Sequence, residues 1–231
     1  MTDDQPAANE ALQMVTAPLV GNDVVDLDDP AIATHHLRER FVHRVCHERE
    51  RAMLARSDAP KALLWTLFAA KEAAFKIVAK LDPQAVFAHS RFVVANDLRA
   101  VVWGDLTLPL RVDVTDAWVH AVVCTARAPI CAVEESGGEP SVAARELLCR
   151  LVAAELGCVA DDLAVVRDPR PGSWTGYGPP RLVSRDGRAI AADVSLSHDG
   201  RFVGCAAHVR SRGDVSSSSL PDGRCHPVLP W

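Results

Sequence analysis

The chain has 231 residues and a formal net charge of -5, and 48% of its residues are hydrophobic. That length and composition suffice for one large or two small folded domains. No apolar run reaches the ~18 residues that a membrane-spanning helix needs, and the acidic start, Met1–Gln5, is unlike a signal peptide. A negative net charge argues against a general nucleic-acid binder. We therefore expect a cytoplasmic protein without membrane or nucleic-acid partners.

The cysteines point to no covalent or metal framework. Their number, seven, is odd, and none of them forms a C-x-x-C pair. This usage predicts neither a disulfide scaffold nor a zinc site. We expect buried, reduced thiols.

Hydrophobic periodicity divides the chain into two halves around a linker at Glu134–Pro140, where charge, glycine and proline interrupt the pattern. Before the linker the pattern predicts a strand, three helices and four strands, at residues 19–27, 31–44, 47–56, 62–80, 86–95, 100–102, 108–114 and 118–126. After the linker it predicts a helix and three strands, at residues 142–156, 163–166, 189–196 and 202–209.

Each half therefore runs from helix to strands and ends in a similar strand, which predicts an α+β fold made of two similar halves. The expected boundaries are 19–133 for the first half and 140–210 for the second. Residues 1–18 are expected to form a flexible N-terminus. Residues 211–231 lack periodicity and are rich in serine and proline, so we expect a disordered tail.

The first of three polar motifs is Gly21-Asn22-Asp23-Val24-Val25-Asp26-Leu27. It has the pattern of an apolar strand interrupted by Asp23, whose charge needs a partner if it is buried. Because side chains alternate along a strand, Asp23 and Asp26 face opposite ways, and a regular strand cannot direct both at one metal ion. The alternative is that Asp23 ends the strand and that Asp26, Asp28 and Asp29 cap the next helix. We prefer that alternative for Asp26, Asp28 and Asp29 and not for Asp23.

The second motif, Phe68-Ala69-Ala70-Lys71-Glu72-Ala73-Ala74-Phe75-Lys76, lies in the predicted helix 62–80. Phe68, Glu72 and Lys76 follow one another at i, i+4 spacing and therefore form one line along the helix. The alternative is an ordinary exposed Glu–Lys pair. An aromatic side chain one turn before Glu72 argues against that alternative.

The third motif, Ser195-Leu196-Ser197-His198-Asp199-Gly200, alternates polar and apolar residues and then turns at Asp-Gly, which is a hairpin signal. The side chains of Ser197 and His198 can donate hydrogen bonds to phosphate oxygens. A histidine at such a place is often only structural, so the motif gains weight from the other two.

Taken in this order, the three motifs resemble the 4′-phosphopantetheinyl transferase superfamily. The first half resembles its short, holo-acyl-carrier-protein-synthase type, which carries F-A-A-K-E-A on a helix. The second half resembles the amino-terminal half of the longer, monomeric type. The resemblance implies a pseudo-dimer of the 4′-phosphopantetheinyl transferase fold within one chain, and hence a monomer.

The activity that the resemblance implies is transfer of phosphopantetheine from coenzyme A to a serine of an acyl or peptidyl carrier protein, with release of adenosine 3′,5′-bisphosphate. It implies Mg²⁺ as cofactor, held by Asp23 and Glu72, and a catalytic role for Glu72 and Lys76. It implies that coenzyme A contacts four side chains, Lys71, Arg181, Ser197 and His198.

Two positions depart from the longer type. That type has a second carboxylate where this chain has Val25, so water or a shifted Asp26 must complete the metal coordination. It also has a lysine where this chain has Pro179, and Arg181 would substitute for it. These departures keep open a degenerate member that binds carrier protein or coenzyme A without turnover. An unrelated Mg²⁺-dependent nucleotide hydrolase is a further alternative.

Carrier proteins of this class are usually acidic, so a basic cluster is expected to receive them. The candidate residues are Arg38, Arg40, Arg44, Arg49 and Arg51. A solvated helix surface explains the same cluster equally well.

Overall fold

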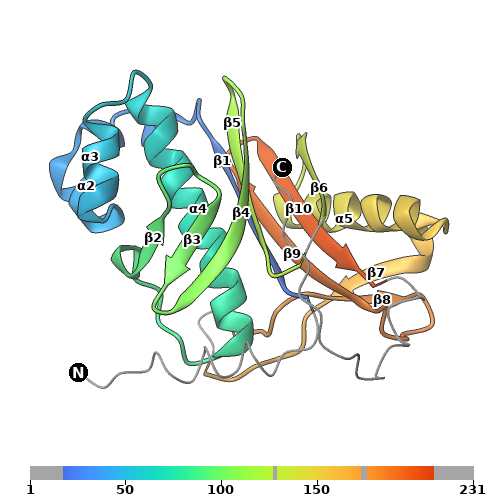
Figure 1. Ribbon diagram of the computed structural model, residues 1–231. Helices are drawn as coiled ribbons and strands as arrows, with labels where there is room; N and C mark the ends of the chain where they lie inside the picture. Colours follow the sequence, from blue (N-terminus) through green and yellow to red (C-terminus); the bar gives the residue numbers. More distant parts are fainter. Residues whose placement is uncertain (1–17, 127–128, 173–175, 211–231) are drawn as a thin grey trace, which may run out of the picture.

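The computed structural model describes residues 18–126, 129–172 and 176–210. Apart from Pro18, the expected flexible N-terminus lies outside this part of the chain, as does the expected tail at 211–231. The described residues form the predicted α+β fold, in which antiparallel sheets are covered by helices (Figure 1). No helix within those ranges combines the length and the apolarity that crossing a membrane requires.

The first half is a five-stranded antiparallel sheet in the order β1-β5-β4-β3-β2, packed against the long helix α4, Pro60–Leu81. Its strands are β1 (Val20–Asp26), β2 (Phe92–Val94), β3 (Ala100–Trp103), β4 (Leu106–Val114) and β5 (Trp118–Cys124). Two short helices, α2 (Glu39–Val45) and α3 (Glu48–Leu54), flank α4, and 3-10 turns occur at η1 (Pro30–Ile32), η2 (His35–Leu37) and η3 (His89–Arg91). The apolar stripe of α4, with Leu64, Leu67 and Ile77 fully buried, forms the core with the sheet.

The second half has a smaller sheet in the order β6-β10-β9, covered by helix α5, with a two-stranded ribbon, β7-β8, beside it. Its elements are β6 (Ile130–Glu135), α5 (Pro140–Leu156), η4 (Ala160–Asp162), β7 (Leu163–Val166), β8 (Arg181–Ser184), β9 (Ala192–Asp199) and β10 (Phe202–Val209). Leu148 and Val152 of α5 pack on Val203 and Cys205 of β10, so this half has a core of its own.

Both halves share one order of elements: a strand, a long helix and four strands, with the first strand pairing antiparallel to the last. β1 pairs with β5 in the first half, and β6 pairs with β10 in the second. β5 and β10 are also the two strands for which the sequence predicts similarity. That this equivalence reflects two fused subunits remains a prediction.

The boundary between the halves differs from the expected one. Residues 130–135, expected to close the first half and open the linker, form β6 and pair with β10 of the second sheet. The second half therefore begins with β6, before the expected start at residue 140. The predicted helix 31–44 is also interrupted, because Arg38 has an extended backbone that separates η2 from α2.

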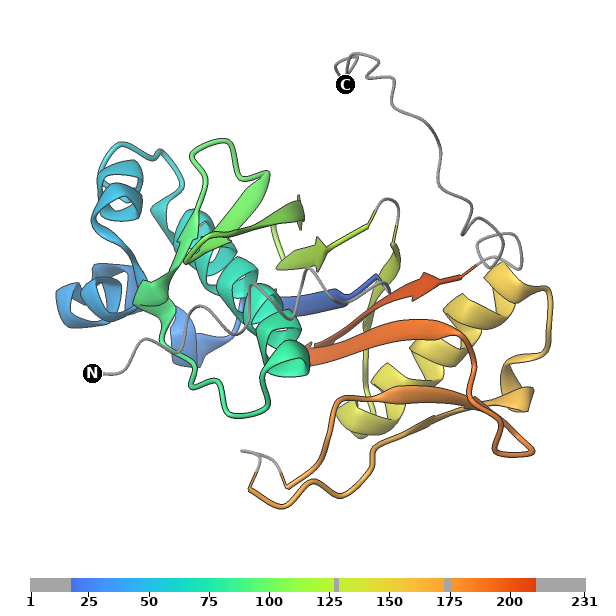
Figure 2. The same cartoon turned by 60° about the horizontal axis from the view of Figure 1, so that its bottom comes forward.

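The halves meet along a seam formed by β1 on one side and β9 and β10 on the other (Figures 1 and 2). β1 is the edge strand of its sheet, so its outward N–H groups need partners. Side-chain oxygens of β9 supply them: Val20 donates to Asp193, Asn22 to Ser195 and Asp26 to Asp199, at 2.6, 3.0 and 2.8 Å. β1 and β9 are therefore joined by hydrogen bonds from backbone N–H groups to side-chain oxygens, in place of the backbone-to-backbone hydrogen bonds of a continuous sheet.

Helix α4 also fastens this seam. The Lys80 ammonium donates to the backbone oxygens of Val20 in β1 and Val194 in β9, at 2.6 and 3.0 Å, and pairs with Asp193 at 2.6 Å. The helix can lie this close because Gly21 has no side chain: a Cβ there would lie 2.0 Å from the carbonyl oxygen of Ala73. The glycine of the first motif therefore sets the distance between α4 and β1.

Candidate active site

Asp23 lies on β1 at the seam, with 15% of its side chain exposed. Its carboxylate accepts a hydrogen bond from the Lys76 ammonium at 3.0 Å. Burial raises the pKa of Asp23 above its usual value, while the charges of Lys76 and His198 oppose that rise. The partner that the sequence requires for a buried Asp23 is therefore Lys76.

Glu72 lies one helical turn before Lys76 on α4 and is 26% exposed. Its pKa is raised to about 7, first by burial and then by the negative charge of Asp23. The fold has thus brought two carboxylates together in a partly buried place, where like charges disfavour ionisation. A cation between them would relieve that repulsion, and two carboxylates are the hard oxygen donors that Mg²⁺ prefers. The residues present therefore fit a magnesium ion.

β1 offers no other metal ligand in place of the carboxylate that the longer type has at the position of Val25. Val25 is 3% exposed and packs in the first core. The Asp26 carboxylate is 3% exposed and accepts two hydrogen bonds from the Arg201 guanidinium, both at 2.9 Å. Of the two expected substitutes for a third ligand, a shifted Asp26 is wrong, because this ion pair holds it away. Asp26 also caps no helix; Asp29 alone caps η1.

Lys76 joins the two halves at the site itself. Its ammonium donates to the Asn22 carbonyl at 2.6 Å and lies 3.4 Å from the Leu196 carbonyl of β9. Unlike Lys80, which is 8% exposed, Lys76 keeps 30% of its side chain accessible. It can therefore both hold the seam and reach a bound anion.

Lys76 and Asp23 line a polar hollow, and the other residues that line it come from the second half. The side chains that line it are Asp23, Lys76, Ser141, Arg145, Arg167, Ser197 and His198, together with Leu196. Next to it, and sharing Lys76, Arg167 and Leu196, is a second hollow with a more apolar lining, which includes Phe75, Tyr177, Pro179 and Pro180. Cationic groups beside an apolar wall suit a ligand that joins phosphates to an aromatic base.

Ser197 and His198 both line this hollow, but in different ways. The Ser197 hydroxyl is nearly buried and accepts a hydrogen bond from the Asn22 side-chain amide at 2.8 Å, while it lies 3.5 Å from the Gly204 carbonyl. His198 is exposed and lies near enough to Asp23 to lower its pKa. Ser197 therefore shapes the wall, whereas His198 is free to contact a ligand.

Lys71 is the expected site residue that the structure contradicts. Its ammonium is fully buried and binds the Glu50 carboxylate at 2.5 Å and the Val45 carbonyl at 2.7 Å. Five residues along a helix turn the side chain well away from Lys76. Glu50 in turn accepts from the backbone N–H groups of His47 and Val94, so this is an internal ion pair of the first half. Lys71 is out of reach of a ligand in the polar hollow.

Arg181 is placed near the site without lining it. Its guanidinium makes two hydrogen bonds to Asp168, both at 2.8 Å. It can contact coenzyme A only by exchanging this carboxylate for a phosphate. Arg145 of α5 and Arg167 after β7, which the sequence analysis did not assign, line the hollow instead. No local pattern marks them, because both lie far in sequence from Asp23 and Lys76.

With this geometry established, comparison with known families adds an independent observation. Residues 19–98 match the family model of the 4′-phosphopantetheinyl transferase superfamily. The chain carries a domain of this superfamily. The match spans β1 to β2 and includes Asp23, Glu72 and Lys76, whereas Ser197 and His198 lie outside it. A search of curated proteins gives no significant match.

Members of this superfamily are phosphopantetheinyl transferases, which generally use coenzyme A and a divalent metal and act on carrier proteins. The second half lies beyond the matched residues. Its part in the site therefore rests on the seam and on the polar hollow.

A second group of metal-binding side chains lies away from this site. Asp113, His120 and Cys131 place one ligand atom each within 4.8 Å of the others. The Arg111 guanidinium already pairs with Asp113 at 2.9 Å, and the His120 ring contacts the Asn22 amide at 3.1 Å. Because two of its three side chains already have these partners, we assign no metal to it.

Proposed function

We propose that the protein transfers the 4′-phosphopantetheine group from coenzyme A to a serine hydroxyl of an apo acyl or peptidyl carrier protein, in a Mg²⁺-dependent reaction that releases adenosine 3′,5′-bisphosphate. One observation carries the proposal. The Asp23 carboxylate of the first half, whose charge raises the pKa of nearby Glu72, lines a hollow to which the second half contributes the cationic side chains Arg145, Arg167 and His198.

Asp23 and Glu72 would hold the metal ion, with water in the remaining positions. Bound there, Mg²⁺ would neutralise the pyrophosphate and stabilise the charge that develops on it. Both carboxylates are on regular elements, Asp23 in the middle of β1 and Glu72 on the partly exposed line of α4 that also carries Lys76. Their distance is set by the close approach of α4 to β1 at Gly21.

The cationic side chains position the phosphates. Lys76 would donate to the leaving phosphate, and His198, Arg145 and Arg167 would hold the other phosphate oxygens. The apolar wall at Pro179 and Pro180 would contact the adenine. Phosphoryl transfer depends mostly on such positioning and charge neutralisation.

Glu72 would also accept the proton of the attacking serine hydroxyl. A carboxylate has about four lone-pair sites, so it can hold a metal ion through one oxygen and accept a proton through another. Removal of this proton makes the oxygen nucleophilic, and the bond to the pantetheine phosphate then forms as the bond to the leaving phosphate breaks.

The carrier protein would dock on helix α2. Arg38, Arg40 and Arg44 surround a surface hollow there together with Phe41, which offers an acidic partner both charge and an apolar contact. Arg51 does not contribute, because its guanidinium donates to the Cys46 carbonyl within the first half. Since both halves of the site are in one chain, a cytoplasmic monomer would be sufficient.

Incubation of the protein with coenzyme A, Mg²⁺ and an apo carrier protein, followed by mass spectrometry of the carrier, tests the function. We expect the carrier to gain the mass of phosphopantetheine and adenosine 3′,5′-bisphosphate to appear in equal amount. Binding without any mass gain would instead identify a degenerate member, an alternative that the apolar Val25 favours. Release of adenosine bisphosphate without carrier protein would identify a hydrolase.

A further inference from the structure

A histidine that the proposed reaction does not use lies beside Glu72. His89 opens the turn η3, between α4 and β2, and its Nε2 lies 3.7 Å from Oε1 of Glu72. The side chains are 19% and 26% exposed. Within the part of the chain that the structure describes, Nε2 of His89 is buried and has no hydrogen-bond partner. A buried polar atom without a partner is rare and calls for an explanation.

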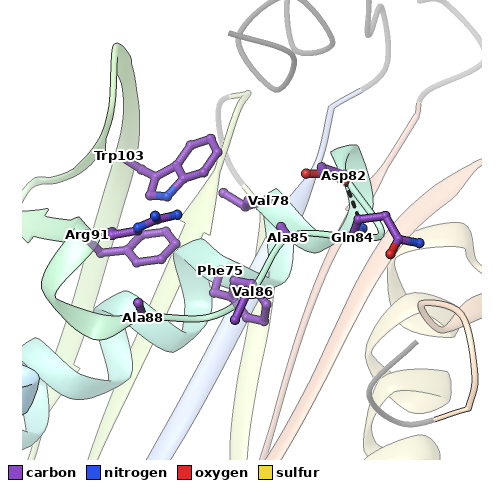
Figure 3. A pocket seen from close by; sticks show the side chains of 10 residues that line it. Phe75, Val78, Asp82, Gln84, Ala85, Val86, Ala88, Arg91 and Trp103 are labelled. Carbon is purple, nitrogen blue, oxygen red and sulfur yellow. Dashed lines mark hydrogen bonds between the residues drawn. The ribbon is translucent and has the colours of Figure 1, made fainter. Parts of the chain in front are cut away.

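The imidazole ring has little freedom to turn elsewhere. Two aromatic rings pack against it, that of Phe68 with centroids 4.8 Å apart and that of Phe87 with centroids 4.2 Å apart. Phe68 is on α4, one turn before Glu72, so the same helix holds the carboxylate and the ring that supports His89. Figure 3 shows part of the segment that follows α4, in which Val86 lies close to Phe75 of that helix.

We propose that His89 is a positioning residue for Glu72, whose carboxylate it holds by a hydrogen bond from Nε2 to Oε1 so that Oε2 faces the cation. The inference rests on the proposed function. The present separation of 3.7 Å is longer than a hydrogen bond, and a small rotation of the partly exposed Glu72 side chain closes it. An imidazole with its proton on Nε2 donates from that atom whether the ring is neutral or protonated.

The hydrogen bond from His89 would orient Glu72 in a site where β1 lacks a second carboxylate. A metal ion at this site has two carboxylate ligands and no third at Val25, so the orientation of each ligand matters more. Hydrogen bonds to the outer atoms of metal ligands fix their orientation, and their loss typically lowers metal affinity by about 10- to 100-fold. Asp23 has such a partner in Lys76. His89 would be the matching partner of Glu72.

The test measures Mn²⁺ affinity of the full chain, without coenzyme A or carrier protein, by the electron paramagnetic resonance signal of the free ion. His89→Phe keeps an aromatic ring between Phe68 and Phe87 and removes the donor. His89→Gln keeps a donor and removes the ring. We expect roughly 10-fold weaker Mn²⁺ binding for His89→Phe and less than about 3-fold for His89→Gln. If His89→Phe does not fold, His89→Leu takes its place.

His35→Phe is the matched control. The His35 ring also packs between aromatic side chains, Phe41 at 4.7 Å and Trp65 at 5.8 Å, and its Nδ1 is also buried without a hydrogen bond among the described residues. Its ring contacts are aromatic, and no ion pair joins it to a carboxylate in those ranges, so Mn²⁺ affinity should not change. Equal weakening in His35→Phe would show a packing effect and overturn the proposal.

Two further outcomes separate this inference from the proposed function. If Glu72→Gln weakens Mn²⁺ binding and His89→Phe leaves it unchanged, the metal site stands and the role of His89 is wrong. If Glu72→Gln leaves Mn²⁺ binding unchanged, or the unaltered protein does not bind Mn²⁺, the proposed metal site is wrong. The proposed role of His89 is then wrong as well.

Discussion

The two halves of the molecule have the same order of elements and opposite chemistry. The first half contributes the Asp23 carboxylate, with Glu72 near enough to interact with its charge, whereas the second contributes Arg145, Arg167 and His198. Each half has its own core and sheet. The comparison teaches that most of the core lies within one half or the other, although a smaller cluster with Val20, Val122 and Ala206 crosses the seam, while the candidate site lies where the halves meet.

Three lysines of helix α4 likewise differ in whether they bind within one half or at the seam. Lys71 is fully buried in an ion pair within the first half, Lys80 is 8% exposed and joins the halves, and Lys76 is 30% exposed at the polar hollow. Their side chains have the same chemistry. Burial and partners alone separate an internal, a seam-forming and a candidate catalytic lysine.

The carboxylates of the first half should show the largest effect. Asp23→Asn and Glu72→Gln are each expected to lower the rate of transfer at least roughly 10²-fold, the scale of removing one preorganised electrostatic group. The melting temperature should not fall, because each change removes a charge that burial opposes. Single-turnover transfer to an apo carrier protein measures this. Near-normal rates in either variant would refute the metal assignment.

Lys80 and Lys76 test the contrast along α4. Lys80→Met should lower the free energy of unfolding by about 3 kcal/mol, because it leaves the Asp193 carboxylate without its buried partner. Lys76→Met should cost less stability and more activity, because Lys76 is more exposed and lines the hollow. Urea denaturation measures the stability of both variants, and transfer assays measure their activity. The reverse ranking would mean that Lys76 is the main link between the halves.

Asp26 should stabilise the seam in a pH-dependent way. Hydrogen bonds from Arg201 hold its pKa at about 2, below the usual 3.8. A carboxyl whose pKa falls on folding stabilises the folded state above its unfolded pKa, and this contribution disappears as the pH drops from about 4 to 2. We expect Asp26→Asn to cost about 2 kcal/mol at neutral pH and about half as much at pH 3.

Urea denaturation at both pH values provides the measurement. Asp28→Asn is the control, because Asp28 binds the same Arg201 but is 60% exposed. Its loss should cost no more than about 1 kcal/mol at either pH. An equal, pH-independent loss in both variants would show that Asp26 acts through packing.

His198 of the second half should show the smallest effect. Since it would bind phosphate in ground state and transition state alike, His198→Ala should raise the KM for coenzyme A, by roughly 10-fold, more than it lowers kcat. Steady-state kinetics with varied coenzyme A separate the two constants. A change confined to kcat would make His198 a participant in the chemistry.

The sequence by itself determined the elements whose signal is local. The long apolar stripe predicted a helix at 62–80, and α4 covers Pro60–Leu81. The strand predicted at 163–166 is β7. Helical spacing also placed Glu72 and Lys76 on one line of that helix, whereas the roles of Asp23, Glu72 and Lys76 came from the family resemblance and stay predictions. Cysteine usage predicted the free thiols among the described residues, although Cys158 is exposed rather than buried.

Only the tertiary structure decided the rest. Residues 130–135 are mostly half-buried and show no alternating pattern, so they become strand β6 only by pairing with β10. Spacing could not tell Lys71 from Lys76, because the burial of each lysine depends on what packs on that side of α4. Arg145 and Arg167 reach Asp23 only when the halves dock. The physical reason is the same in each case: these placements come from contacts between segments far apart in the chain, and no local pattern encodes them.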